Sequence, residues 1–248
     1  MARQAWRLYR SNFAALFLSV LPFVVLTAAI FFALVTSITL RADNVLLVVL
    51  ARDLMRLVFS SFAVAVAVVV VADRLAGKEG SVRGALREVT GSAPSIFLGA
   101  GLSSLPYIFT FFMFGPYMAP FLRELFVGPP VVITVIVLER ARIGAALTRA
   151  RELLDKNWSR MLLYLITVAA GVGLVDFVIQ QSAIRAVSAA ATDVVGLSLA
   201  VFVSVVVPAV LLPFVACVWL IAYFDLRARA EDFDEQAMIA LRTTPPPE

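Results

Sequence analysis

The chain has 248 residues, of which 62% are hydrophobic and 15% are charged, with a formal net charge of +4 at pH 7. Its mean hydropathy of +0.96 exceeds what a soluble domain of this length could bury, so the composition indicates an integral membrane protein. The absence of histidine removes the commonest general base and the commonest metal ligand. We therefore expect a protein that is not an enzyme, with no catalytic residue, cofactor or metal site.

The first apolar segment, residues 13–40, contains no charged residue and exceeds the roughly 20 residues that cross a bilayer core. No small-residue cleavage site follows it, which favours a mature transmembrane helix over a signal peptide. The single cysteine, Cys217, excludes a disulfide within the chain. Five more apolar segments follow, at about 50–72, 94–122, 125–138, 161–184 and 194–224.

Charged segments with helical periodicity precede the first, third and fifth apolar segments. At an offset of 80 residues, Arg3 aligns with Arg83 and Arg7 with Arg87, and Ser81 is placed to cap the second of these helices. This pattern predicts an all-α polytopic membrane protein. Its six transmembrane helices form three repeats, each an interfacial amphipathic helix followed by two crossings.

The three repeats cover about 1–73, 81–139 and 141–226, within a single membrane domain over residues 1–230. We expect residues 231–248 to form a cytoplasmic tail that is partly disordered. Sixteen of the 21 basic residues fall on the side of the two termini, so the positive-inside rule places both termini in the cytoplasm.

The third interfacial helix, residues about 141–159, carries the densest positive charge in the chain. Its apolar side is expected to include Ile143, Leu147, Ala150 and Leu154, which would hold it in the membrane surface. Its basic side would face anionic phospholipids or a membrane-protein partner. The residues expected to contact lipid or a partner are Arg142, Arg149, Arg151, Lys156, Trp158 and Arg160.

Asp176 is the only acidic residue inside an otherwise apolar segment, and Gln180 lies one helical turn later. Counted from Met161, Asp176 lies roughly 22 Å along a helix, in the outer third of the membrane. Two interpretations stay open. The pair lies at the outer interface, or it forms a buried intramembrane polar site of the kind that transporters use.

An acidic residue followed by arginine ends each second apolar segment. These residues either form ion pairs at the cytoplasmic boundary or make contacts between repeats or with a partner. The residues concerned are Asp73 and Arg74, Glu139 and Arg140, and Asp225 and Arg227. No nucleotide-binding fingerprint is present, and the basic residues alternate with membrane-facing aromatics, which argues against nucleic-acid binding.

Two stretches, 139–160 and 208–234, resemble the membrane domain of some bacterial glycerophosphoryl diester phosphodiesterases and related free-standing bacterial membrane proteins. The likeness implies the fold and a bacterial inner membrane location, but the histidine-dependent chemistry of the fused enzymes has no counterpart here. The matching residues are Glu139, Gly144, Ala146, Leu147, Arg149, Leu153, Asn157, Trp158, Arg160, Pro208, the run from Tyr223 to Arg229, and Phe233-Asp234.

Two functions from different classes therefore remain. The first is a non-catalytic inner-membrane module that organises lipids, or docks a protein partner, through its cytoplasmic basic helices. The alternative is a small transporter or permease for a lipid-like or small solute, for which a buried Asp176 would be the indicator.

Overall fold

The computed structural model describes residues 2–37, 42–102, 130–155 and 194–231 of the chain. All regular structure in these ranges is helical, as the sequence predicts. The three longest helices are α1 (Ala2–Ser37), α2 (Ala42–Leu75) and α8 (Val194–Glu231). The shorter ones are α3 (Val82–Gly91), the helix over Ala93–Leu102, α5 (Pro130–Leu138) and α6 (Ile143–Asp155).

Three stretches are long and apolar enough to cross a membrane, namely Arg3–Ile30, Leu54–Leu75 and Val205–Glu231. They lie in α1, α2 and α8, which correspond to the first, second and sixth apolar segments of the sequence. Most of the expected third crossing, the start of the fourth and the whole of the fifth lie outside the described residues. The described part of α5 starts at Pro130.

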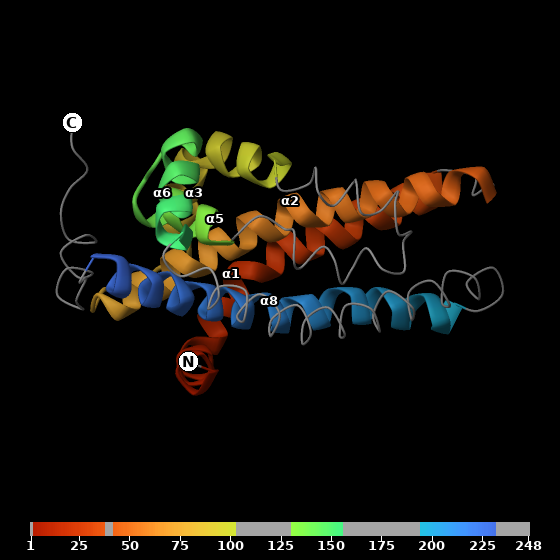
Figure 1. The fold of residues 1–248 in the computed structure, drawn as a ribbon. Coiled ribbons are helices and arrows are strands. Elements are labelled where there is room, and N and C mark those ends of the chain that lie inside the picture. Colours follow the sequence, from red (N-terminus) through yellow and green to blue (C-terminus); the bar gives the residue numbers. More distant parts are fainter. Residues whose placement is uncertain (1, 38–41, 103–129, 156–193, 232–248) are drawn as a thin grey trace.

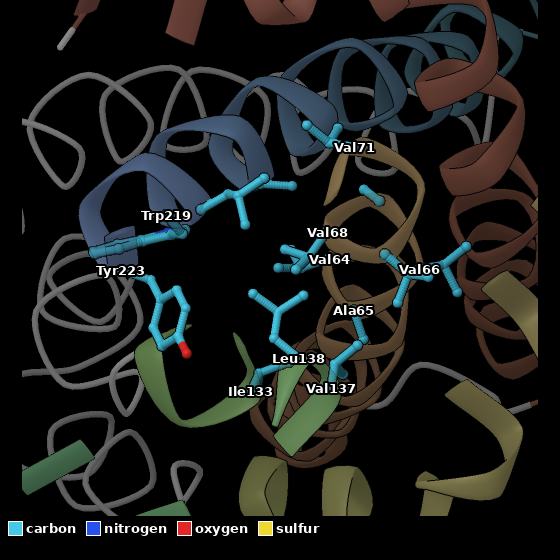
Figure 2. Packing of buried hydrophobic residues seen from close by; sticks show 14 of the residues in the cluster. Val64, Ala65, Val66, Val68, Val71, Ile133, Val137, Leu138, Trp219 and Tyr223 are labelled. Atoms are coloured by element: carbon cyan, nitrogen blue, oxygen red, sulfur yellow. The ribbon is translucent and has the colours of Figure 1, made fainter. Parts of the chain in front are cut away.

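α2 is the central helix, because α1, α3, α5 and α8 all pack against it. Every residue from Ala63 to Ala72 is buried. This run consists only of alanine and valine, and such small side chains let neighbouring helices approach from every side. Figure 2 shows Val64 and Val68 of α2 facing Leu138 of α5 and the α8 residues Trp219 and Tyr223.

Aromatic residues join the first turns of α1 to α8. The hydroxyl of Tyr9 donates to the carbonyl oxygen of Val210 at 3.1 Å. The rings of Tyr9 and Trp6 both contact Phe214, with centroid distances of 5.8 and 6.2 Å. α8 continues as one helix through Pro208 and Pro213 in this region. The N-terminal turns, which we expected to be a separate interfacial helix, are therefore continuous with α1 and packed on protein.

One end of the bundle gathers the start of α1, the ends of α2 and α8, and the short helices α3 and α6 (Figure 1). We call this end the basic end. α3 begins as predicted, since the Ser81 hydroxyl accepts a hydrogen bond from the N–H of Gly84 at 2.9 Å. The side of α3 that faces α2 is apolar, with Ala85 and Val89 buried.

The buried face of α6 differs from the one that we expected. Ala146, Ala150 and Leu153 are buried, whereas Leu147 is 42% exposed. The reason is that α6 packs on α5 and α8, and the alanines permit a closer approach than Leu147 would. The apolar side of α6 therefore faces protein over these residues. Of the expected apolar side, Ile143, Ala150 and Leu154 pack in or against the core, and Leu147 does not.

Candidate functional site

The segment between α5 and α6 presents its charges in two directions. α5 ends at Leu138, and the N–H of Glu139 still donates to the carbonyl of Val135 at 2.9 Å. Arg140 then adopts a left-handed backbone conformation with φ of 52°, which turns the chain toward α6. As a result the Arg140 guanidinium lies 3.5 Å from a carboxylate oxygen of Glu88 on α3. Glu139 is left facing α6 and α8.

Four charged side chains form a closed ring of alternating sign at this place. Glu139 Oε2 lies 3.4 Å from Arg149 Nε on α6, and Arg149 Nη2 contacts Glu231 Oε1 at the end of α8. Glu231 Oε2 accepts from Arg227 Nε at 2.9 Å, and Arg227 Nη1 lies 3.6 Å from Glu139 Oε1. We call these four residues, together with Tyr223, the charged ring.

Tyr223 joins two members of the charged ring. Its hydroxyl donates to Glu139 Oε1 at 2.6 Å and accepts from Arg227 Nη1 at 2.9 Å. In Figure 2 the ring of Tyr223 is among the buried apolar side chains and its hydroxyl points toward the ribbon of the α5–α6 segment. The aromatic body of Tyr223 thus belongs to the core, while its polar end joins α8 to α5.

Burial increases from the rim of the charged ring to its inner side. Arg149 is 29% exposed at its side chain, whereas Arg227 is 10% exposed. Partial burial acts to lower the pKa of Arg149, but the carboxylates of Glu139 and Glu231 outweigh it and raise that pKa above its usual value. Arg149 therefore keeps its charge. Because two carboxylates balance two guanidinium groups, the charged ring joins α5, α6 and α8 with no net charge.

Seven further arginines form an exposed cationic surface at the basic end. In the described part of the chain none of these seven has an ion pair with an acidic side chain. They are Arg3, Arg7 and Arg10 of α1, Arg83 and Arg87 of α3, and Arg142 and Arg151 of α6. Trp6, which is 54% exposed, lies on the same surface beside the arginines of α1. Exposed arginine beside tryptophan is a composition that suits a membrane interface.

The expected lipid- or partner-facing residues divide into three groups. Arg142 and Arg151 are exposed, as a docking surface requires. Arg149 is instead held by Glu139 and Glu231, because the same turn of α6 that faces α8 carries it. Three more of these residues, together with the proposed intramembrane pair, lie outside the described residues. They are Lys156, Trp158, Arg160, Asp176 and Gln180.

The acid-arginine neighbours find partners away from each other in the sequence. Glu139 and Arg140 diverge as described, and Asp225 accepts from Arg229 at 3.2 Å. Arg74 Nη1 donates to Asn12 Oδ1 on α1 at 2.7 Å. The physical reason is helix geometry, since residues one or two apart lie on different sides while those four apart are neighbours. The contacts seen for Glu139, Arg227 and Arg74 join separate helices.

Glu231 is the member of the charged ring that sequence analysis missed. It lies four residues after Arg227, and this spacing on a helix is the signal that could have found it. The other four members all belong to the residues that carried the resemblance. The contacts between them could not be predicted from the sequence, since Glu139 and Tyr223 lie 84 positions apart.

Comparison with known proteins finds no matching family model, no matching curated protein and no matching solved structure. Within the described residues, no group of three or more histidine, cysteine, aspartate or glutamate side chains could hold a metal ion.

Proposed function

We propose that the protein is a non-catalytic module of the bacterial inner membrane whose basic end engages the headgroups of anionic phospholipids. The observation that carries the proposal is the set of exposed arginines on α1, α3 and α6, gathered at one end of an apolar bundle beside the exposed Trp6. Each such cation near an anionic leaflet contributes on the order of 1 kcal/mol. Docking of a membrane-protein partner on the same surface is the second form of this proposal.

The basic end is also the proposed cytoplasmic side of a six-crossing topology built from three repeats. α1 starts and α8 ends there, which is the arrangement that an even number of crossings requires (Figure 1). Residues 80 positions apart share the same environment, since Arg3 and Arg7 are exposed like Arg83 and Arg87. The buried pairs at this offset are Ala5 and Ala85, Tyr9 and Val89, Leu16 and Ile96, and Val20 and Ala100.

This topology predicts the sidedness of two engineered cysteines in a Cys217→Ser background. A cysteine at Lys78, which is exposed in the turn after α2, is expected to react only from the cytoplasmic side. A cysteine at Arg41 is expected to react only from the opposite side. A membrane-impermeant maleimide applied to intact and to permeabilised cells measures both. Labelling of both positions from the same side would contradict an odd number of crossings between them.

The lipid proposal is tested with Arg142→Gln/Arg151→Gln. Removal of two exposed cations should lower the retained ratio of phosphatidylglycerol to phosphatidylcholine by about thirtyfold, given about 1 kcal/mol for each residue. The measurement is lipid analysis of the protein purified from vesicles that contain both lipids. The effect should weaken as salt is raised, because screening acts over about 8 Å at physiological ionic strength.

The matched control is Arg142→Lys/Arg151→Lys, which keeps the charge and should keep the lipid ratio. If the glutamine variant folds and retains the same lipid ratio as the unchanged protein, the exposed arginines only orient the chain and the lipid proposal fails. Loss of a co-purifying protein instead of lipid would favour the partner form. The transporter alternative depends on Asp176 and Gln180, which lie outside the described residues.

A further inference from the structure

Two guanidinium groups from separate helices converge on one carboxylate in the charged ring. Arg227 Nε of α8 donates to Glu231 Oε2 at 2.9 Å, and Arg149 Nη2 of α6 contacts the other oxygen, Oε1. Each oxygen of the Glu231 carboxylate therefore has one arginine donor, Oε1 from α6 and Oε2 from α8. Paired arginine donors around an anionic group are the arrangement by which proteins recognise phosphate.

Both guanidinium groups have other contacts that hold them in place. Arg149 Nε lies 3.4 Å from Glu139 Oε2. Arg227 Nη1 is bonded to the Tyr223 hydroxyl at 2.9 Å and lies 3.6 Å from Glu139 Oε1. None of these contacts involves Glu231. If Glu231 moved away, Arg149 Nη2 and Arg227 Nε would stay in position as donors. The other carboxylate near Arg149, Glu152, lies 3.6 Å from Nη1 and is 61% exposed.

Glu231 is the more exposed of the two carboxylates in the charged ring. Its side chain is 25% exposed, against 18% for Glu139 and 10% for Arg227. The position that its carboxylate occupies is therefore open to the surroundings of the basic end, while the arginine beneath it is covered. An anion that reached this position would meet donors already oriented by Glu139 and Tyr223.

We infer that Arg149 and Arg227 form a binding site for the phosphate group of a phospholipid headgroup, and that Glu231 occupies this site as an internal competitor in the present structure. The inference rests on the proposed function and gives it a specific site. Glu139 and Tyr223 act as positioning residues for the two arginines.

The test is Glu231→Gln in the full chain, with Asp225→Asn as the matched control. Both variants remove one negative charge from the last turns of α8, but Asp225 pairs with Arg229 outside the charged ring. Glu231→Gln is expected to raise phosphatidylglycerol retained from mixed vesicles at least threefold, and Asp225→Asn is expected to change it little. The gain should disappear in Glu231→Gln/Arg149→Gln. Equal gains in both single variants would show a general charge effect and overturn the inference, as would no gain in Glu231→Gln.

Glu231→Ser supplies a second variant without the carboxylate, and it must show the same gain. Competition with inorganic phosphate separates the two sources of the anion. Retained phosphatidylglycerol should be unaffected by millimolar phosphate if the ligand is a lipid headgroup, and full displacement would overturn the lipid assignment. Failure here is distinct from failure of the proposed function, because Arg142 and Arg151 lie outside the charged ring and are tested separately.

Discussion

Replacement of Arg227 by methionine is expected to lower the free energy of unfolding by about 3 kcal/mol, because it leaves the Tyr223 hydroxyl without its cation, and Glu139 with Arg149 alone, in a largely buried place. Methionine keeps much of the side-chain volume, so the loss reports the broken charged ring rather than a cavity. Equilibrium unfolding in mixed detergent micelles measures it. The second replacement Glu139→Gln should then cost less than it does in the unchanged chain, since the two residues interact directly.

Arg229→Met is the control for this substitution. Arg229 lies on the same helix, but its side chain is 45% exposed against 10% for Arg227, and its partner Asp225 is 23% exposed. Exposed pairs contribute about 0–1 kcal/mol, so this variant should unfold within 1 kcal/mol of the unchanged protein. Equal losses in the two variants would show that the charged ring contributes nothing beyond an ordinary surface pair.

Gly80→Ala is expected to cost about 3 kcal/mol, the second large effect. Gly80 has φ of 58°, in the left-handed region that glycine adopts at no steric cost. A Cβ atom there would also lie 2.5 Å from Arg74 Cγ and 2.9 Å from the carbonyl oxygen of Val70. Because Arg74 is hydrogen bonded to Asn12 of α1, displacing its side chain would disturb the contact between α1 and α2. The same unfolding measurement applies.

Gly77 offers the matched control for the steric part of this loss. It ends α2 with φ of 75°, where its N–H donates to the carbonyl of Arg74 at 3.1 Å. A Cβ atom at Gly77 would have nothing within 4 Å. Gly77→Ala should therefore cost only the left-handed conformation, about 1 kcal/mol. If both alanine variants lose the same stability, the close approach of Gly80 to α2 has no energetic consequence.

The helices of the bundle were predictable where hydropathy alone determines them. The uncharged stretch from 13 to 40 and the valine-rich stretch before Asp73 gave α1 and α2, and the cap at Ser81 gave the start of α3. The face that each short helix buries was harder to predict from the sequence. A stripe through Leu147 is the better apolar face of an isolated helix, and only the presence of α5 and α8 makes Ala146 and Leu153 the buried residues.

The candidate site was predictable in most of its residues and not in its arrangement. Glu139 and Arg227 were recognisable as charges at the ends of apolar segments, and Arg149 as a basic residue of the third interfacial helix. Their contacts depend on the left-handed turn at Arg140 and on the packing of α6 against α8, neither of which a hydropathy pattern encodes. For the same reason the sequence predicted Arg149 to be a surface cation, whereas in the structure it contacts two carboxylates from other elements.

The burial of α2 on all sides also constrains the order of assembly during synthesis. α1 and α2 leave the ribosome well before α5 and α8, so the alanine and valine surface from Ala63 to Ala72 must contact lipid or an insertion factor while the later helices are made. Contact of this surface with lipid tails is not costly, since it carries no charged or polar side chain. The pair of α1 and α2 can remain in the bilayer while later segments are made, and the core is completed only when α8 packs against α2.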